Sequence, residues 1–390
     1  MKIKIGLFFG GKSVEHEVSV ISAMQALNHF DREKYELIPV YISRDGGFYT
    51  GPMAGTLEAY RDLKALTGQL TRVIPARVED RVLLLQWGRH GPKRKALAEL
   101  DLAFPVVHGT NVEDGALQGY FRTLGLPFAG CDVAASAMGM DKYAQKLLFR
   151  AAGLPVLDAL QLHISRPREG MEQEILEKIG LPVVVKPADL GSSVGIGLAR
   201  DEGALSRALD EAFSFSSTVL AERAVQNLRE LNCAVLGDRW EAQASLVEEP
   251  VMQDEILSYE DKYVSGGKGG SKGMRGLKRL LPAPIPDSLR DTVQDYALRA
   301  FRALDCSGVA RIDFLMDNES GEIWINEINT TPGSLAFYLF EGAGVPYPML
   351  LDRLVKLALK RERERSSYQF EIETGILSGY TGGGKLGGKA

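Results

Sequence analysis

Four polar residues near the carboxyl end of the chain alternate along two predicted strands in a pattern that suits metal binding. They lie within ARIDFLMDNESGEIWINEINTTPGS, residues 310–334. Because alternate residues of a strand share a face, Arg311 and Asp313 point together on the first strand, and Glu327 and Asn329 on the second. Two carboxylates and an amide oxygen are hard ligands that Mg²⁺ binds, while phosphate and water take its other positions. The hairpin therefore predicts a Mg²⁺ site.

The alternative interpretation of this hairpin is a solvated polar face on an antiparallel sheet, which such alternation usually indicates. Ile323 and Ile325 lie on the same predicted face of the strand as Glu327 and Asn329, so this face changes abruptly from apolar to polar near the strand end. An abrupt change favours a binding site over a uniformly solvated face.

A second candidate is VVVKPADLGSSVGIG, residues 183–197, which reads as a strand with a lysine, a loop of glycine and serine, and a second strand. Small residues let the backbone approach an anion closely, serine hydroxyls add donors, and Lys186 can place its charge on a phosphate. Ordinary hairpin loops are also rich in glycine and serine. This stretch alone leaves phosphate binding and a plain hairpin as open alternatives.

The stretch GLFFGGKS, residues 6–13, matches the phosphate-loop pattern G-x-x-x-x-G-K-[ST]. A phosphate loop is a glycine-rich turn whose backbone N–H groups wrap the phosphates. Here Leu7, Phe8 and Phe9 continue an apolar strand, and the turn starts only at Gly10. We therefore expect any nucleotide to bind elsewhere.

Two further turns, KSVEHEVSV and HGTNVEDG, each follow a predicted strand. Both are expected at the carboxyl edge of a parallel sheet, where open α/β folds bind ligands, so Glu15, His108 and Glu113 would converge there. Taken separately, Glu15 is typical of an acid that interacts with a helix dipole, and His108 of a structural histidine.

The elements that position these residues begin with alternating apolar strands and amphipathic helices. A strand at 2–9 and a strand at 35–42 flank a helix whose apolar residues Val18, Ile21, Met24 and Leu27 have helical spacing. A strand at 102–108 and a helix at 116–124 follow. Residues 1–130 are therefore predicted to form a doubly wound α/β domain.

Two smaller α+β units are predicted at 131–218 and 219–360. The elements expected in the first are a helix at 134–152, strands around Val156 and at 181–188, and a helix at 202–213. Those expected in the second are strands at 218–225, 230–237, 239–247, 309–317 and 322–329, and a helix at 288–304. Turns separate most of these last strands, which predicts an antiparallel sheet. Residues 361–390, rich in glycine and lysine near their end, are predicted to form a flexible tail.

Composition permits an ordinary enzyme with a large core. The 390 residues are 45% apolar, and 46 basic against 51 acidic residues give a net charge of −5, which provides no overall attraction for nucleic acid or for anionic membranes. No stretch approaches the roughly 20 apolar residues of a membrane helix, and no cleavable leader is recognised. Cys131, Cys233 and Cys306 are too scattered for a disulfide framework or zinc site. A cytoplasmic location is expected.

Several motifs together carry a family resemblance. GGKSVEHEVS, HGTNVEDGALQGYFRTLGLPFAG, SAMGMDK, LPVVVKPADLGSSVG, YEDKYVSGG, ARIDF and NEINTTPGS occur in the order found in D-alanine–D-alanine ligases, and the chain resembles that ATP-grasp family over about residues 1–360. Motifs in a shared order are far more specific than any one alone. The resemblance implies an ATP-grasp fold, in which ATP is held between the two α+β units and Lys12 lies in a substrate-binding turn.

The resemblance also implies a reaction. ATP would phosphorylate the carboxylate of one D-alanine, and the amine of a second would attack the acyl phosphate, giving D-alanyl-D-alanine, ADP and phosphate for peptidoglycan synthesis. Such ligases commonly form homodimers.

The residues implied to act fall into four groups. ATP would contact Lys142 and Lys186 through its phosphates, Lys262 near the γ-phosphate, Ser193 in the loop, Glu222, Arg223 and Val225 around adenine, and Glu230 at the ribose. Two Mg²⁺ ions, with Mn²⁺ as an alternative, would bind Asp313, Glu327 and Asn329. Arg311 and the N–H of Gly333 would stabilise the oxyanion. The first substrate would contact Glu15, His108 and Glu113, with Glu15 linked through Ser192 to Tyr263 on a closing loop.

The sequence departs from the family at three places. Asn111-Val112 replaces a usual glycine pair, the segment after Tyr263 is unusually rich in glycine and lysine, and Tyr338-Leu339 stands where many members use serine and leucine to read the second substrate's carboxylate. The alternatives are a ligase with another amino acid or a hydroxy acid as second substrate, and a nucleotide-binding regulator without catalysis. The set Arg311, Asp313, Glu327 and Asn329 favours catalysis over regulation.

Overall fold

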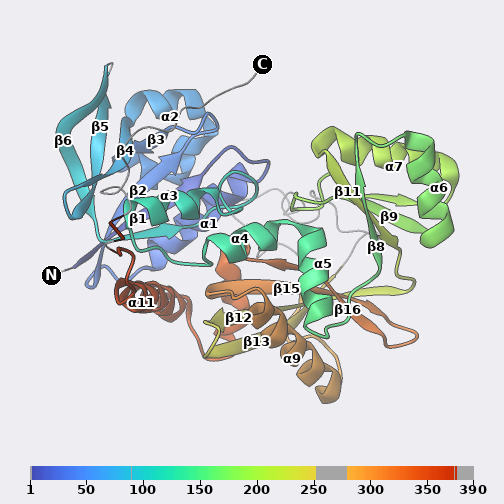
Figure 1. The fold of residues 1–390 in the computed structure, drawn as a ribbon. Coiled ribbons are helices and arrows are strands. Elements are labelled where there is room, and N and C mark those ends of the chain that lie inside the picture. The colour runs from blue at the N-terminus through green and yellow to red at the C-terminus, as the bar shows by residue number, and fades with distance from the viewer. Residues whose placement is uncertain (1, 89, 252–278, 373, 376–390) are drawn as a thin grey trace, which may run out of the picture.

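The computed structural model describes residues 2–88, 90–251, 279–372 and 374–375, and three β-sheets lie within these ranges (Figure 1). Figure 1 shows three units, each built around one sheet, with helices α4 (Val133–Met140) and α5 (Lys142–Ala151) between them. The predicted fold class, an α/β domain followed by two α+β units, is confirmed.

The first unit is a seven-stranded sheet of order β6-β5-β4-β3-β2-β1-β7. Its strands are β1 (Ile3–Gly10), β2 (Tyr35–Ile42), β3 (Phe48–Thr50), β4 (Thr71–Val78), β5 (Arg81–Gly88), β6 (Gly91–Leu100) and β7 (Leu102–Pro105). β2, β1 and β7 are parallel, whereas β3 to β6 form an antiparallel extension that sequence analysis did not predict. Short helices pack beside α1 on one face of this sheet: η1 (Pro52–Gly55), η2 (Leu57–Arg61) and α2 (Leu63–Gln69).

Strand β1 is buried on both faces, as the centre of a parallel sheet requires. α1 (His16–His29) packs with Phe9 on one face, and α3 (Ala116–Leu124) packs with Phe8 on the other. Residues 6–10 of the phosphate-loop pattern lie inside β1, so that pattern does not form a phosphate loop. One detail of the prediction was wrong, because β7 ends at Pro105 rather than at His108. The helix predicted from Val18 to Leu27 is confirmed, although Ile21 is exposed on α1.

The predicted helix 134–152 is two helices. It breaks at Asp141, whose carboxylate accepts hydrogen bonds from the backbone N–H groups of Tyr143 and Ala144 and so caps α5. The break places Lys142 at the first position of α5, where its backbone N–H donates to the carbonyl of Ala188 at 2.9 Å.

The second unit is an antiparallel sheet of order β10-β9-β11-β8, with two helices packed against it. Its elements are β8 (Ala159–His163), α6 (Arg168–Lys178), β9 (Val183–Pro187), β10 (Gly197–Ala199), α7 (Glu202–Phe215) and β11 (Thr218–Arg223). The strand predicted around Val156 begins only at Ala159, and α6 was not predicted. β11, which we placed in the third unit, pairs with β9 and β8 instead.

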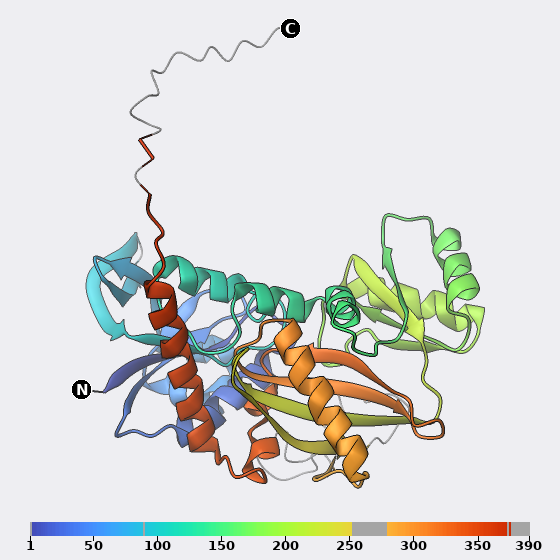
Figure 2. The same cartoon turned by 60° about the horizontal axis from the view of Figure 1, so that its bottom comes forward.

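The third unit is an antiparallel sheet, as predicted, and its strand order is β14-β13-β12-β15-β16. Its strands are β12 (Leu228–Gly237), β13 (Ala242–Pro250), β14 (Arg279–Leu280), β15 (Gly308–Asp317) and β16 (Ile323–Asn329). Figure 2 shows α9 (Asp287–Ala303) lying across one face. Phe301 of α9 packs there with Ile312 and Phe314, which leaves the polar residues of β15 for the opposite face.

A β-bulge interrupts the pairing of β15 with β16. Asp313 lies opposite Glu327, but the next residue, Phe314, lies opposite Ile325, so Asn326 is the extra residue. The bulge reverses the alternation, and Ile325 is fully buried while Glu327 is not. Ile325 and Glu327 were predicted to lie on the same face of the sheet, and that prediction was wrong. The bulge explains why the polar face begins abruptly.

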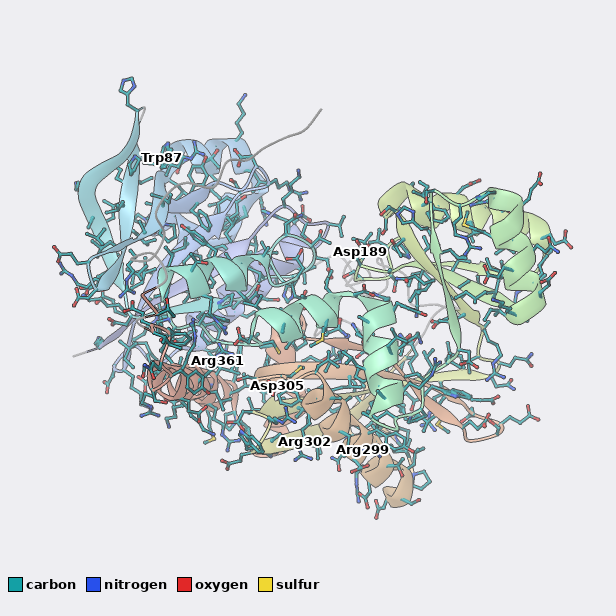
Figure 3. All side chains as sticks on the ribbon, viewed as in Figure 1. Trp87, Asp189, Arg299, Arg302, Asp305 and Arg361 are labelled. Carbon is teal, nitrogen blue, oxygen red and sulfur yellow. The ribbon has the colours of Figure 1, made fainter. Side chains whose placement is uncertain are left out.

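The chain then returns to the first unit through η4 (Gly333–Ala336), α10 (Phe337–Glu341) and α11 (Tyr347–Ser366). Arg361 of α11 donates to the carbonyls of Phe128 and Gly130, where α11 meets the first unit (Figure 3). The tail predicted to be flexible from residue 361 is thus helical to Ser366, and residues 376–390 lie outside the described residues. In the described part of the chain, no helix has the length and apolar composition needed to cross a bilayer.

Candidate active site

Two cavities meet where the three units come together. The first is lined by residues of all three units, among them Glu15, His108 and Glu113 of the first, Ser192 of the second, and Arg311, Gly333 and Tyr338 of the third. The second lies between the four-stranded and five-stranded sheets, with lining residues that include Lys186, Ser193, Glu222, Arg223, Val225 and Asn326. They share Lys142, Leu190, Gly191, Ser192, Glu230, Asp313 and Glu327. These shared residues form the junction of the two cavities.

The polar hairpin faces this junction. The guanidinium of Arg311 donates to both carboxylate oxygens of Asp313, from Nε at 2.6 Å and from Nη2 at 2.7 Å. Asn329, which lies opposite Arg311 in the strand register, donates to Asp313 Oδ2 at 3.1 Å. Glu327 lies opposite Asp313, and its Oε2 is 3.1 Å from Lys142 Nζ. The predicted carboxylates and amide therefore lie together and are paired with two cations.

A buried ion cluster forms one wall of the second cavity. The carboxylate of Glu222 contacts Lys186 and lies 2.8 Å from Lys146 Nζ, and all three side chains are almost fully buried. Burial opposes the charge of Glu222, but the two lysines hold its pKa at about 2. Lys186 also donates to Asn326 Oδ1 at 3.0 Å.

Sequence analysis missed Lys146 and Asn326. Lys142 and Lys146 are four residues apart, which places them on the same face of α5 and was the available signal for Lys146. No local pattern marks Asn326, because it lines the cavity through the bulge.

The loop that carries Ser192 reaches the first unit. Figure 3 shows the neighbouring Asp189 on the side of the second unit that faces the first. Ser192 donates a hydrogen bond to Glu15 Oε1. A Cβ at Gly191 would come within 2.8 Å of Glu15 Oε2, so glycine is needed for this close approach.

His108 and Glu113 are both buried beside the first cavity and have shifted pKa values. His108 Nδ1 donates to the carbonyl of Thr331 at 2.9 Å, and burial lowers the pKa of His108 to about 4, so its ring is neutral at pH 7. Its Nε2 therefore accepts from Ser22 Oγ at 3.2 Å. Glu113 accepts from the N–H of Thr331 at 2.9 Å, while burial and the charge of Glu15 raise its pKa to about 8.

The far end of the first cavity has residues that sequence analysis did not predict. Tyr338 donates through its hydroxyl to Glu248 Oε1 at 3.0 Å, and Asn232, the cross-strand partner of Glu248, donates to the same oxygen at 3.1 Å. The guanidinium of Arg279 lies 4.0 Å from the centre of the Tyr338 ring. The available signal for Asn232 and Glu248 was that each is a polar residue within an otherwise apolar strand, and the two strands pair so that these residues face each other.

Three expected site residues are not placed at these cavities. Leu339 is fully buried in the hydrophobic core beneath α1 and α11, because its side chain points away from the cavity that Tyr338 lines. Lys262 and Tyr263 lie outside the described residues.

Comparison with known families explains why these residues converge. Family models described as D-ala D-ala ligase N-terminus and D-ala D-ala ligase C-terminus match residues 4–131 and 148–356. The chain belongs to the D-alanine–D-alanine ligase family. Its fold is accordingly the ATP-grasp fold, and ATP use is a property of this family.

Individual relatives agree over nearly the whole chain. The chain is 36% identical to the D-alanine–D-alanine ligase of Thermosipho melanesiensis, covering 96% of this chain and 98% of the relative, and 38% identical to that of Acetivibrio thermocellus, covering 92% and 96%. Among solved structures, it is similar to the D-alanine–D-alanine ligase of Coxiella burnetii, with a TM-score of 0.78, 30% identity and coverage of 94% and 96%. It is also similar to the VanG D-Ala:D-Ser ligase of Enterococcus faecalis, with a TM-score of 0.77, 30% identity and coverage of 92% and 100%.

The raised pKa of Glu113 predicts a specific dependence of stability on pH. The folded protein retains the proton of Glu113 up to about pH 8, whereas the unfolded chain loses it near 4.5. Between these values the folded state binds more protons, so stability falls as pH rises, by at most about 1.4 kcal/mol per pH unit. Glu113→Gln removes this titration, and the variant should therefore gain stability relative to the wild type from pH 5 to pH 8.

Urea unfolding of both proteins at several pH values measures this difference. The exchange of one acceptor oxygen for an amide shifts the stability of the variant by a constant amount. The titrations of groups that do not interact with Glu113 are common to both proteins. The slope of the difference is therefore the readout, and parallel pH profiles would contradict the buried neutral carboxyl.

Proposed function

We infer that this chain is an ATP-dependent D-alanine–D-alanine ligase, which joins two D-alanines through D-alanyl phosphate and releases ADP and phosphate. The observation that carries this proposal is the junction of the two cavities at Lys142, Ser192, Asp313 and Glu327. One cavity suits a nucleotide and the other suits two small zwitterions. Their junction is where a phosphoryl group would pass from ATP to a carboxylate.

In this proposal ATP lies in the larger cavity, between the four-stranded and five-stranded sheets. Lys186 and Lys142 contribute positive charge near the phosphates, and the loop at Ser193 adds small polar residues. Pro182, Val184 and Leu315 supply an apolar wall for a planar base. Glu222 is neutralised by Lys146 and Lys186, so this wall carries no net negative charge to repel the nucleotide.

We propose that Asp313, Glu327 and Asn329 hold two Mg²⁺ ions, which Mn²⁺ can replace. Their oxygens meet at the cavity junction, and Asp313 lies directly opposite Glu327 in the strand register. The described residues contain no group of three or more histidine, cysteine or carboxylate side chains that could hold a metal alone. This fits magnesium, which keeps phosphate and water among its ligands. When bound, the ions would neutralise charge on the transferring phosphoryl group.

The first D-alanine binds at the other side of the junction. Glu15, held by Ser192, pairs with its ammonium group, and the neutral His108 lies near its carboxylate without adding a charge. After phosphoryl transfer, the amine of the second amino acid attacks the acyl carbon. Arg311 and the N–H of Gly333 stabilise the oxyanion, with Arg311 held in place by both oxygens of Asp313. Enclosure by three units limits the access of water to the acyl phosphate.

A second candidate function differs only in the acceptor. The VanG relative is named a D-Ala:D-Ser ligase, and the acceptor end of the present cavity contains Tyr338 in place of the small residue that is common in the family. A ligase with another amino acid or a hydroxy acid as second substrate would use the same donor residues. We further propose that the enzyme acts in the cytoplasm, in peptidoglycan synthesis, as a homodimer.

A product assay tests the function. With ATP, Mg²⁺ and D-alanine alone, we expect D-alanyl-D-alanine and one ADP for each dipeptide, detected by mass spectrometry. A panel of D-amino acids and D-hydroxy acids added as competitors ranks the acceptors. A mixed product that dominates at equal concentrations would favour the second candidate, and ADP formed without any D-alanine would contradict both.

The nucleotide site predicts opposite effects for two lysines. Lys186→Ala should weaken ATP binding by about 10- to 100-fold, because it removes a buried charge beside the second cavity. Lys12→Ala should leave ATP binding nearly unchanged, because Lys12 is exposed after β1 and lines neither cavity. Calorimetric titration with ATP measures both, and the reverse order would restore the phosphate-loop interpretation.

The metal site predicts a loss of turnover in Glu327→Gln. The amide keeps the shape of the side chain but removes its charge, so turnover should fall at least about 100-fold while the fold is retained. Glu322→Gln, at an exposed position of the same hairpin, is the matched control. Near-normal turnover of Glu327→Gln at saturating Mg²⁺ would show that the carboxylate holds no metal.

A further inference from the structure

We propose that Arg279 binds the carboxylate of the second amino acid and makes this ligase selective for acceptors that carry one. The proposal rests on the function proposed above and concerns the end of the first cavity where the sequence departs from its family. An acceptor amino acid offers an amine for attack and a carboxylate for recognition. The carboxylate requires a cation with donors that are not already engaged.

Among the described residues that line the first cavity, three are lysine or arginine: Lys142, Arg279 and Arg311. Lys142 is 3.1 Å from Glu327, and Arg311 gives two hydrogen bonds to Asp313. Arg279 differs, because its Nη2 is buried and has no hydrogen-bond partner among the described residues. A buried donor without a partner costs free energy unless a ligand satisfies it.

The surroundings of Arg279 hold its guanidinium in place without consuming all its donors. The guanidinium carbon lies 4.0 Å from the centre of the Tyr338 ring, within the range of a cation–π interaction. Its Nη1 lies 3.5 Å from Glu248 Oε2, while Glu248 Oε1 accepts from Tyr338 and Asn232. Glu248 is thus fixed by two further residues, and Nη2 of the planar guanidinium is left without a partner among the described residues.

This arrangement changes the role of Tyr338. Its position corresponds to the residue through which many family members read the acceptor carboxylate, but its hydroxyl is engaged by Glu248. Tyr338 is therefore a positioning residue that supports the guanidinium with its ring. The same cavity contains Arg311 and Gly333, the proposed oxyanion donors, so an acceptor held by Arg279 lies in the same enclosed space as the acyl carbon.

A competition experiment isolates the acceptor carboxylate. D-Alanine and D-alaninamide are offered together at equal concentrations with ATP and Mg²⁺, because the amide has an amine but no carboxylate and cannot be activated as donor. The ratio of dipeptide to dipeptide amide equals the ratio of the two kcat/KM values, whatever the rate of the first step. Hydroxylamine in a separate assay traps D-alanyl phosphate as the hydroxamate and reports the donor half-reaction alone.

We expect wild type to favour D-alanine strongly, and Arg279→Gln to reduce the product ratio by about 10- to 100-fold, the effect of losing a charge-assisted hydrogen bond. Hydroxamate formation should stay within about twofold of wild type. Arg279→Lys, which keeps the charge but not the planar fork, should give an intermediate ratio. Arg290→Gln, on the exposed side of α9, is the matched control and should change neither readout.

Tyr338→Phe tests the positioning role. The substitution keeps the ring beside Arg279 and removes only the hydroxyl that donates a hydrogen bond to Glu248, so we expect a smaller fall in the product ratio than in Arg279→Gln. A fall in the product ratio as large as that of Arg279→Gln would contradict the proposal that the ring of Tyr338 positions the guanidinium of Arg279.

The outcomes separate this proposal from the function itself. An unchanged product ratio in Arg279→Gln, or a wild type that does not prefer D-alanine over its amide, would overturn the role of Arg279. Equal losses of hydroxamate and dipeptide in both Arg279 variants would also overturn it, because they would indicate a general structural role. Absence of hydroxamate in the wild type would instead contradict the proposed ligase function.

Discussion

Buried charges hold this site together, because a charge removed from water must be paired or its burial is costly. Several of these contacts join elements that are distant in the sequence, although Arg311 and Asp313 pair within one strand. Lys142 of α5 meets Glu327 of β16, Ser192 of the second unit holds Glu15 of the first, and Glu113 of the first accepts from Thr331 of the third. The site therefore exists only where all three units meet, and its charges also fix how they meet.

The same pairing prepares the site for an anionic substrate. Carboxylates that neutralise Lys142, Lys186 and Arg311 keep these cations oriented toward the cavities before any ligand arrives, so little reorganisation remains for the reaction. In the proposed mechanism, phosphates and metal ions take over part of this pairing. In the same proposal, the neutral His108 and Glu113 would line the donor end of the cavity without adding charges that compete for the substrate.

Sequence reasoning reached the local features of this site but not the tertiary ones. The strand β1 is a continuous apolar run, the helix α9 has apolar residues at a period near 3.6, and the polar residues of the hairpin alternate, and a single sequence displays all three patterns. The bulge at Asn326 shifts a register between two strands, and a one-residue shift leaves no mark in either strand alone. The cluster around Arg279 and Glu248 was missed for the same reason, because its members come from separate strands. The family motifs predicted residues for the proposed donor side, but offered no guide where the chain departs from them.

The central claim is that a phosphoryl group crosses the junction of the two cavities to a substrate carboxylate, and isotope transfer tests it most directly. The enzyme is supplied with ATP, Mg²⁺ and D-alanine labelled with ¹⁸O in its carboxylate, and both products are analysed by mass spectrometry. The account predicts one ¹⁸O atom in the released phosphate for each D-alanyl-D-alanine formed, because the acyl phosphate loses its bridging oxygen with the phosphate. Dipeptide accompanied by unlabelled phosphate would contradict it.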